Sequence, residues 1–364
     1  MVLAGNNVIR EDVFREELDE KLAPSLGGIV LGSEPEIYRE PEKFFSITLV
    51  TEQVAEIVAN IAKVLTSGEG TKVILLSAYF GGGKTHTLIS LFHALKNPRA
   101  LERAVVENQR ARELINRAVE SLAGISKSID IVVIDGHTEA LAPTPVKPLE
   151  VGSYRVQTLW GYLAHSLGSY SSLRAHDEKM TVPGVDTLVS LFSNRRIIIL
   201  IDEIAAYVKS LYVSADQGLK GYASAISTFM ERLAKAVEAS QNIVLVVSLP
   251  MAVSGEEVKG VEKGYEVVRD ILKSIVKALA RVSSRYIEPV TPRNIPALLR
   301  TRLFSSIDGS RREHVRNSLL SAYQNGEVFD KNLARRVSME VDETYPFHPL
   351  YIDTLIDILD KHEK

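Results

Sequence analysis

One stretch decides the fold of this chain: Lys72-Val73-Ile74-Leu75-Leu76-Ser77-Ala78-Tyr79-Phe80-Gly81-Gly82-Gly83-Lys84-Thr85-His86-Thr87. An apolar run typical of a buried strand leads into a glycine triplet, and Gly-Lys-Thr then opens an apolar helix. Glycines let the backbone turn its N–H groups toward an anion, and a helix N-terminus favours negative charge at the same point. The stretch is therefore predicted to be a phosphate-binding loop.

Each polar residue of this loop has an expected role. Lys84 is expected to reach the β- and γ-phosphates of a nucleotide, and the Thr85 hydroxyl to ligate Mg²⁺. The pattern G-x-x-x-x-G-K-[ST] departs from its usual form only at Ala78, a position that leaves the strand without cradling phosphate. His86 has no sequence partner for metal binding or proton transfer, so local packing is expected of it. The predicted nucleotide-binding residues are Tyr79, Phe80, Gly81, Gly82, Gly83, Lys84, Thr85 and His86.

A second motif lies far downstream. The apolar run 197–201 is typical of a strand buried on both faces of a parallel sheet, and Asp202 and Glu203 follow it. Open α/β sheets bind ligands at this end of their strands. Asp202 is predicted to hold Mg²⁺ through water, and Glu203 to polarise the attacking water. Taken alone, the pair is equally typical of a solvated acidic turn; the upstream loop favours nucleotide binding. The glycine triplet and acidic pair are expected to meet across adjacent strand tips.

Strands alternate with helices over most of the chain, which predicts an α/β fold: a five-stranded parallel P-loop sheet flanked by helices. The expected strands are residues 73–76, 129–134, 197–201, 242–247 and 286–290. Residues 11–22 and 49–65 are predicted to be helical, residues 24–41 turn-rich, and residues 98–123 one long helical stretch. Only helices are expected after residue 291. The predicted domains are an N-terminal extension (1–66), an ATPase core (67–290) and a helical lid (291–364).

Composition sets further bounds. Hydrophobic residues make up 45% of the 364 residues and charged residues 24%, as in ordinary globular proteins. The net charge of −3 excludes a global basic field for nucleic acid, and the absence of cysteine excludes disulfides and thiolate metal sites. Without a signal-peptide pattern or a long apolar segment, the protein is expected in the cytoplasm, with no membrane partner. The amphipathic run at residues 350–359 predicts that the chain is part of a longer protein.

The order of these parts resembles the AAA+ class of ATPases. Scattered runs resemble more closely a domain-of-unknown-function family of large prokaryotic AAA+-like ATPases, encoded beside adenine-specific DNA methyltransferases and helicases in phage-defence islands. These runs are Phe44-Phe45 with Thr48 and Thr51, Tyr79 to His86, Thr158-Leu159-Trp160-Gly161, Asp202-Glu203 with Tyr207, Ser248-Leu249-Pro250, Arg302-Leu303-Phe304 and Tyr345-Pro346-Phe347-His348-Pro349. The resemblance implies an ATP-driven role in DNA modification or defence, with DNA and a methyltransferase or helicase as partners. A homo-oligomer is also an expectation.

The resemblance also implies roles outside the two motifs. Ser248 lies where an AAA+ protein carries its first sensor of the γ-phosphate; a residue that merely begins the following turn is the alternative. Arg281 and Arg285 lie where such proteins present an arginine finger to a neighbouring subunit. Arg302, at the start of the lid, is a third candidate for a finger or sensor. Solvated or ion-paired surface arginines are the alternative for all three.

The sequence thus favours an Mg²⁺-dependent ATPase in which Glu203, Lys84 and Ser248 serve catalysis while Thr85 and Asp202 hold the metal. ATP is expected rather than GTP because the chain has no Asn-Lys-x-Asp motif. A nucleotide-gated scaffold with little or no hydrolysis is the main alternative. A small-molecule kinase is a third hypothesis, which the absence of a recognisable acceptor motif disfavours.

Overall fold

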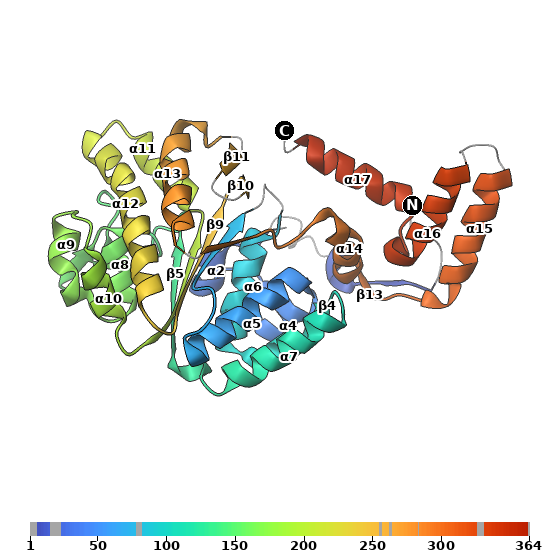
Figure 1. The fold of residues 1–364 in the computed structure, drawn as a ribbon, viewed down its shortest axis with the longest axis horizontal. Helices are drawn as coiled ribbons and strands as arrows, with labels where there is room; N and C mark the ends of the chain where they lie inside the picture. The colour runs from blue at the N-terminus through green and yellow to red at the C-terminus, as the bar shows by residue number, and fades with distance from the viewer. Residues whose placement is uncertain are drawn as a thin grey trace.

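The computed structural model describes residues 6–14, 23–77, 82–254, 257–261, 264–282, 284–325 and 331–362. A five-stranded parallel sheet forms its centre (Figure 1). In spatial order the strands are β12 (Ser284–Ile287), β3 (Val73–Ser77), β9 (Ile243–Leu249), β8 (Arg196–Asp202) and β5 (Ile129–Asp135). All five predicted strands are present, and every neighbouring pair is parallel. The predicted α/β fold class is confirmed.

The spatial order of the strands corrects one expectation. Strand β3, which leads into the glycine loop, and strand β8, which carries the acidic pair, are not neighbours. Strand β9 lies between them and pairs with both. Crossover helices carry the chain over the faces of a parallel sheet, so consecutive strands need not be adjacent. As a result, Ser248, near the end of β9, lies between the glycine loop and Asp202.

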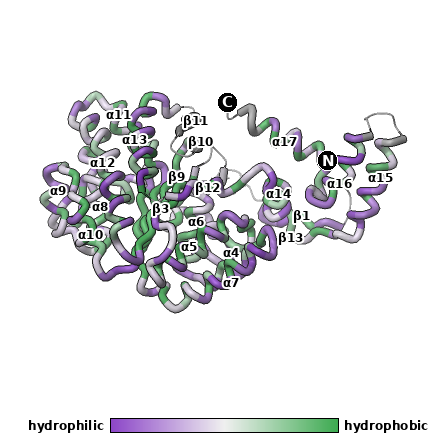
Figure 2. Tube along the Cα trace, viewed as in Figure 1, coloured by the Kyte–Doolittle hydropathy of each residue, from purple (hydrophilic) through white to green (hydrophobic). Residues whose placement is uncertain are grey.

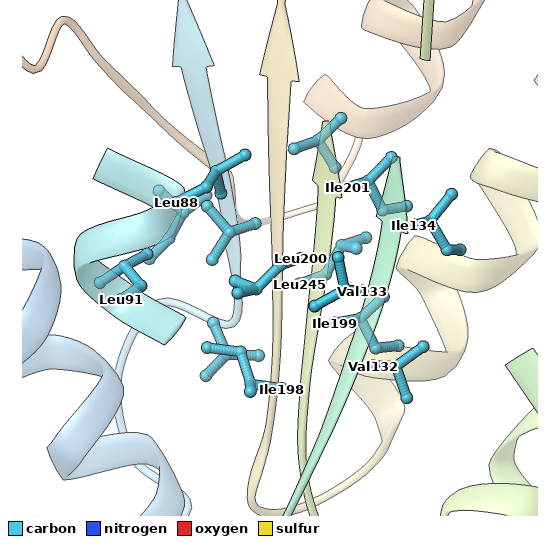
Figure 3. Close-up of a cluster of buried hydrophobic side chains, with 14 of the residues drawn as sticks. Leu88, Leu91, Val132, Val133, Ile134, Ile198, Ile199, Leu200, Ile201 and Leu245 are labelled. Carbon is cyan, nitrogen blue, oxygen red and sulfur yellow. The ribbon is translucent and has the colours of Figure 1, made fainter. Parts of the chain in front are cut away.

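Branched apolar side chains fill the space around the sheet. Figure 3 shows Leu88 and Leu91 of one helix facing Ile198 and Leu200 of β8, with Val133 of β5 nearby. Residues 197–201 are all buried, because helices cover both faces of the sheet. This burial explains the unbroken apolar run in the sequence, which does not alternate with polar residues.

Two groups of helices form the outer layers (Figure 1). One group contains α5 (Glu52–Ser67), α6 (Lys84–Lys96) and α7 (Gln109–Ala123); the other contains α8 (Leu159–Ser166), α10 (Val185–Phe192), α11 (Ile204–Tyr212), α12 (Gln217–Ala239) and α13 (Arg269–Ala280). Their ends follow local sequence signals. Thr51, Asn108 and Thr158 cap α5, α7 and α8 through their side chains. Gly68, at φ +76°, ends α5 in the left-handed conformation.

Several local predictions need correction. The stretch 24–41 contains α2 (Leu26–Leu31) and α3 (Glu36–Arg39), followed by α4 (Pro41–Ser46). Residues 98–123 are not one helix, because η2 (Pro98–Arg103) leads into β4 (Val105–Val106), which pairs with β2 (Leu49–Val50) before Asn108 starts α7. Residues 49 and 50 are therefore strand, not helix. Of the helix predicted over residues 11–22, Glu11–Phe14 form a 3₁₀ turn, and residues 15–22 lie outside the described chain.

Three short pairings were not predicted. Antiparallel hairpins join β6 (Leu149–Val151) to β7 (Tyr154–Val156) and β10 (Met251–Ser254) to β11 (Glu257–Val261). Strand β13 (Phe304–Ser306) pairs with β1 (Val8–Ile9), so the region after residue 291 is not helical throughout.

The C-terminal region consists mainly of α14 (Ile295–Leu303), α15 (Arg312–Asn325), α16 (Lys331–Thr344) and α17 (Pro349–His362). Its small apolar cluster, built on Phe304, Phe347 and Ile352, is separate from the main core. Figure 2 shows apolar segments concentrated in the sheet, with many hydrophilic stretches along α15 and α16. Throughout the described residues, each helix is too short or too polar to cross a lipid bilayer.

Candidate functional site

A cavity of about 490 Å³ opens at the carboxyl ends of the central strands. This is the edge at which parallel sheets place their ligand sites. Its polar lining combines both predicted motifs, contributed by Gly82, Gly83, Lys84, Thr85, His86, Glu203 and Ser248. Further lining residues are Ala23, Pro24, Tyr38, Ile47, Leu49, Thr51, Val54, Thr87, Ser90, His137, Pro250, Tyr265, Val290, Leu298 and Arg302. The two motifs that lie more than 100 residues apart in the sequence therefore meet around one cavity.

The glycine turn is shaped for close approach. Gly83 has a φ of +73° and precedes the first residue of α6, Lys84. A Cβ atom at Gly83 would lie 2.8 Å from Cγ2 of Val290, so a side chain here would need both a strained backbone and displaced packing. The N-terminus of α6 opens into the cavity and favours an anion. Tyr79, Phe80 and Gly81 lie outside the described residues, so their contacts remain predictions.

Asp202 is buried beside the cavity. Its side chain is 1% exposed and accepts hydrogen bonds from the hydroxyls of Ser248 and Thr85. The backbone N–H of Glu203 donates to Oδ1 of Asp202 over 3.1 Å. Burial raises the pKa of Asp202, and these hydrogen bonds oppose that rise by favouring the ionised form. In this structure Ser248 therefore contacts Asp202.

The contact between Thr85 and Asp202 provides two hard oxygen ligands at the base of the cavity. Mg²⁺ prefers such ligands and usually completes its coordination with water and phosphate oxygens rather than with protein groups alone. No cluster of three or more metal-ligating side chains occurs within the described chain. The donor set fits an ion that arrives with a nucleotide, rather than a site in which the protein supplies every ligand.

Glu203 lies at the mouth of the same cavity. Its backbone is left-handed (φ +53°), which turns the chain from β8 directly into α11. Oε2 of its carboxylate accepts a hydrogen bond from the Tyr265 hydroxyl over 3.4 Å and lies 4.0 Å from Nδ1 of His137. Burial and then the charge of Asp202 raise the pKa of Glu203, while His137 and Lys84 lower it. A carboxylate with a raised pKa beside a glycine turn and a helix N-terminus can act as a base.

The end of strand β5 supports this arrangement. Asp135 is in register with Asp202, and its carboxylate accepts hydrogen bonds from the backbone N–H groups of Gly27 (2.7 Å) and His137 (2.9 Å). A Cβ atom on Gly136 would lie 2.0 Å from the carbonyl oxygen of Glu203. The turn that follows β5 thus passes directly beside Glu203, and only glycine fits there. Sequence reasoning missed this support, although an acidic residue at a strand end was a visible signal.

The far end of the cavity is lined by Tyr38, His86 and Arg302. Arg302, from α14, donates through Nη2 to the Tyr38 hydroxyl over 3.0 Å and lies 5.7 Å from the centre of that ring. Its buried Nη1 has no hydrogen-bond partner among the described residues. His86 contacts Oγ1 of Thr48 over 3.1 Å and packs 4.7 Å from the Phe44 ring centre. Burial, followed by the charges of Arg302 and His93, lowers the pKa of His86 to about 4.

The three arginines predicted as a finger or sensor differ in their position relative to the cavity. Arg302 lines the cavity. Arg281 and Arg285 do not: Arg281 lies 3.8 Å from Glu231, and Arg285 lies 2.5 Å from Glu56, both at the surface. An action of either residue on a neighbouring subunit remains a prediction. His86 is neutral near pH 7 and has the local contacts expected for it, with Phe44 and Thr48 as partners.

Two family models match consecutive parts of the chain. The family model of the DUF499 N-terminal domain matches residues 2–287, and that of the DUF499 second domain matches residues 291–364. No curated protein matches the sequence. Among solved structures, the Aeropyrum pernix Orc1 protein in complex with DNA is similar over 80% of this chain, at 15% identity and a TM-score of 0.30. The present chain covers 58% of that Orc1 chain.

Proposed function

The chain belongs to the DUF499 family, and we propose that it binds ATP with Mg²⁺ and hydrolyses it to drive a conformational change or a remodelling step. The observation that carries this proposal is that Lys84, Thr85 and Glu203 line one cavity beside a glycine turn, with Asp202 hydrogen-bonded to Thr85. Phosphates need cationic and N–H donors, Mg²⁺ needs oxygen ligands, and an attacking water needs a base.

In the proposed reaction, the N-terminus of α6 and Lys84 bind the β- and γ-phosphates. Thr85 and Asp202 hold Mg²⁺, which would neutralise charge that develops on the phosphate oxygens. Glu203 accepts a hydrogen bond from the attacking water and aligns it with the γ-phosphate. Ser248, between these groups, fixes the orientation of Asp202 through its hydroxyl. Catalysis is therefore mainly positioning and electrostatic stabilisation by groups that are already in place.

The proposal is tested by measuring phosphate release from ATP by the purified chain, in Mg²⁺ and in excess EDTA. We expect turnover in Mg²⁺ and none in EDTA. Titrations with ATP and GTP in parallel test the expected preference for adenine. Tight ATP binding without turnover under any condition would instead favour a nucleotide-gated scaffold.

Arg302 is proposed to bind the nucleotide directly. A buried guanidinium N–H without a partner needs an acceptor, and a nucleotide in this cavity offers phosphate oxygens and ring nitrogens. A hydrogen bond to a charged group contributes about 1.5–3 kcal/mol, so Arg302→Met is expected to weaken ATP binding about 10- to 100-fold in a calorimetric titration. Arg117→Met, which removes an exposed arginine that pairs with Glu113 and does not line the cavity, is the matched control. Equal ATP affinity of both variants and the wild type would contradict the assignment.

The wider role that we propose is DNA modification or phage defence, and it is supported only by the resemblance of the scattered sequence runs. DNA and a methyltransferase or helicase are the partners that this resemblance implies. Stimulation of phosphate release by duplex DNA would support the DNA role. Sizing measurements with and without a non-hydrolysable ATP analogue would test whether nucleotide promotes a homo-oligomer, in which Arg281 or Arg285 could reach a neighbouring site.

A further inference from the structure

We propose that Tyr265 is a positioning residue that holds the carboxylate of Glu203 in its working orientation. This inference rests on the proposed ATP hydrolysis and concerns a residue that neither sequence motif contains. Tyr265 precedes the 3₁₀ turn η5 (Glu266–Val268), 62 residues beyond Glu203, and lines the nucleotide cavity. Its hydroxyl donates to Oε2 of Glu203 over 3.4 Å.

The Tyr265 ring has a second contact, with Lys209. Nζ of Lys209, on α11, lies 5.5 Å from the ring centre, within the range of a cation–π interaction. A second cavity of about 620 Å³ lies between α11 and residues 136–147, and it shares only Tyr265 and His137 with the described lining of the nucleotide cavity. Both shared residues face Oε2 of Glu203. The wall between the two cavities is thus the structure that contacts the carboxylate.

A fixed carboxylate has a physical advantage in this reaction. The terminal torsion of a glutamate side chain is broad, so an unrestrained carboxylate samples many orientations. A donor on Oε2 limits this rotation and leaves Oε1 to accept a hydrogen bond from water. The Tyr265 ring is also rigid, and α11 carries both Lys209 and the residue that follows Glu203. Tyr265 therefore ties the carboxylate to the helix that begins beside it.

The test is Tyr265→Phe, which keeps the ring and its contact with Lys209. We expect kcat for ATP to fall about 3- to 10-fold. The hydrogen bond is long, at 3.4 Å between the two oxygens, so its contribution lies at the weak end of the range of hydrogen-bond energies. The ATP dissociation constant should stay within twofold of the wild-type value. Tyr212→Phe, on the same helix as Lys209, should leave both quantities unchanged.

The outcomes separate this inference from the proposed function. Wild-type protein without any turnover contradicts ATP hydrolysis itself. Wild-type turnover together with an unchanged rate in Tyr265→Phe contradicts only the positioning role. A fall in kcat that is accompanied by an equal loss of ATP affinity also contradicts it, because a merely structural defect of the cavity would lower both. Retained ATP affinity shows that the variant has folded.

Discussion

Lys84→Ala is expected to abolish measurable ATP binding. Lys84 is the first residue of α6, follows the left-handed Gly83, and lines the cavity on the same side as Thr85. Its ammonium group is the cation of the glycine loop that can meet the β- and γ-phosphates. Hydrogen bonds to charged groups contribute about 1.5–3 kcal/mol each, so loss of two such contacts weakens binding about 100-fold or more. Isothermal titration of the variant with ATP and Mg²⁺ measures the effect.

The matched control is Lys96→Ala, the same substitution at the other end of the same helix. Lys96 lies over the Phe92 ring, with Nζ 4.6 Å from its centre, and does not line the cavity. Lys96→Ala should bind ATP as the wild type does. Circular dichroism on both variants checks that α6 remains folded. ATP affinity of Lys84→Ala within threefold of that of Lys96→Ala would show that the cavity does not bind phosphate through this lysine.

The strands of the sheet and the two motifs could be predicted from the sequence because the patterns that mark them are local. Residues 197–201 form one unbroken apolar run, and the acidic pair follows without a gap. Thr158 is a recognisable cap before an apolar helix, and α8 begins at the next residue. These features depend on neighbours within a few positions, so an unaided reading of the chain finds them.

The surroundings of Glu203 could not be found in this way. His137 and Tyr265 approach the same carboxylate oxygen from segments 66 residues before it and 62 residues after it. Nothing near either residue in the sequence marks it as part of the site. The insertion of β9 between β3 and β8 is equally a property of the whole sheet, because each crossover can return the chain to any free edge. Contacts that depend only on the order of the strands cannot be predicted from local sequence patterns.

Glu203→Gln is expected to retain ATP binding and lose nearly all turnover. The amide has the shape of the carboxylate, and its oxygen can still accept the hydrogen bond from the Tyr265 hydroxyl. It has no negative charge with which to polarise the attacking water or to take up its proton. General-base catalysis contributes about 10²- to 10⁴-fold, which is the expected fall in phosphate release. ATP affinity should remain near the wild-type value, because Lys84, Thr85 and Asp202 are untouched.

Phosphate release and calorimetry on the same preparation separate binding from chemistry in this variant. Glu178→Gln makes the identical substitution at an exposed carboxylate that pairs with Arg174 over 2.7 Å, far from the cavity lining, and should hydrolyse ATP at the wild-type rate. Wild-type turnover by Glu203→Gln would remove Glu203 from the reaction and, with it, the positioning role of Tyr265. The binding roles of Lys84 and Arg302 would be unaffected, because they depend on the cavity and not on the base. The roles of Glu203, Lys84 and Arg302 can therefore be measured separately, although all three side chains line the same cavity.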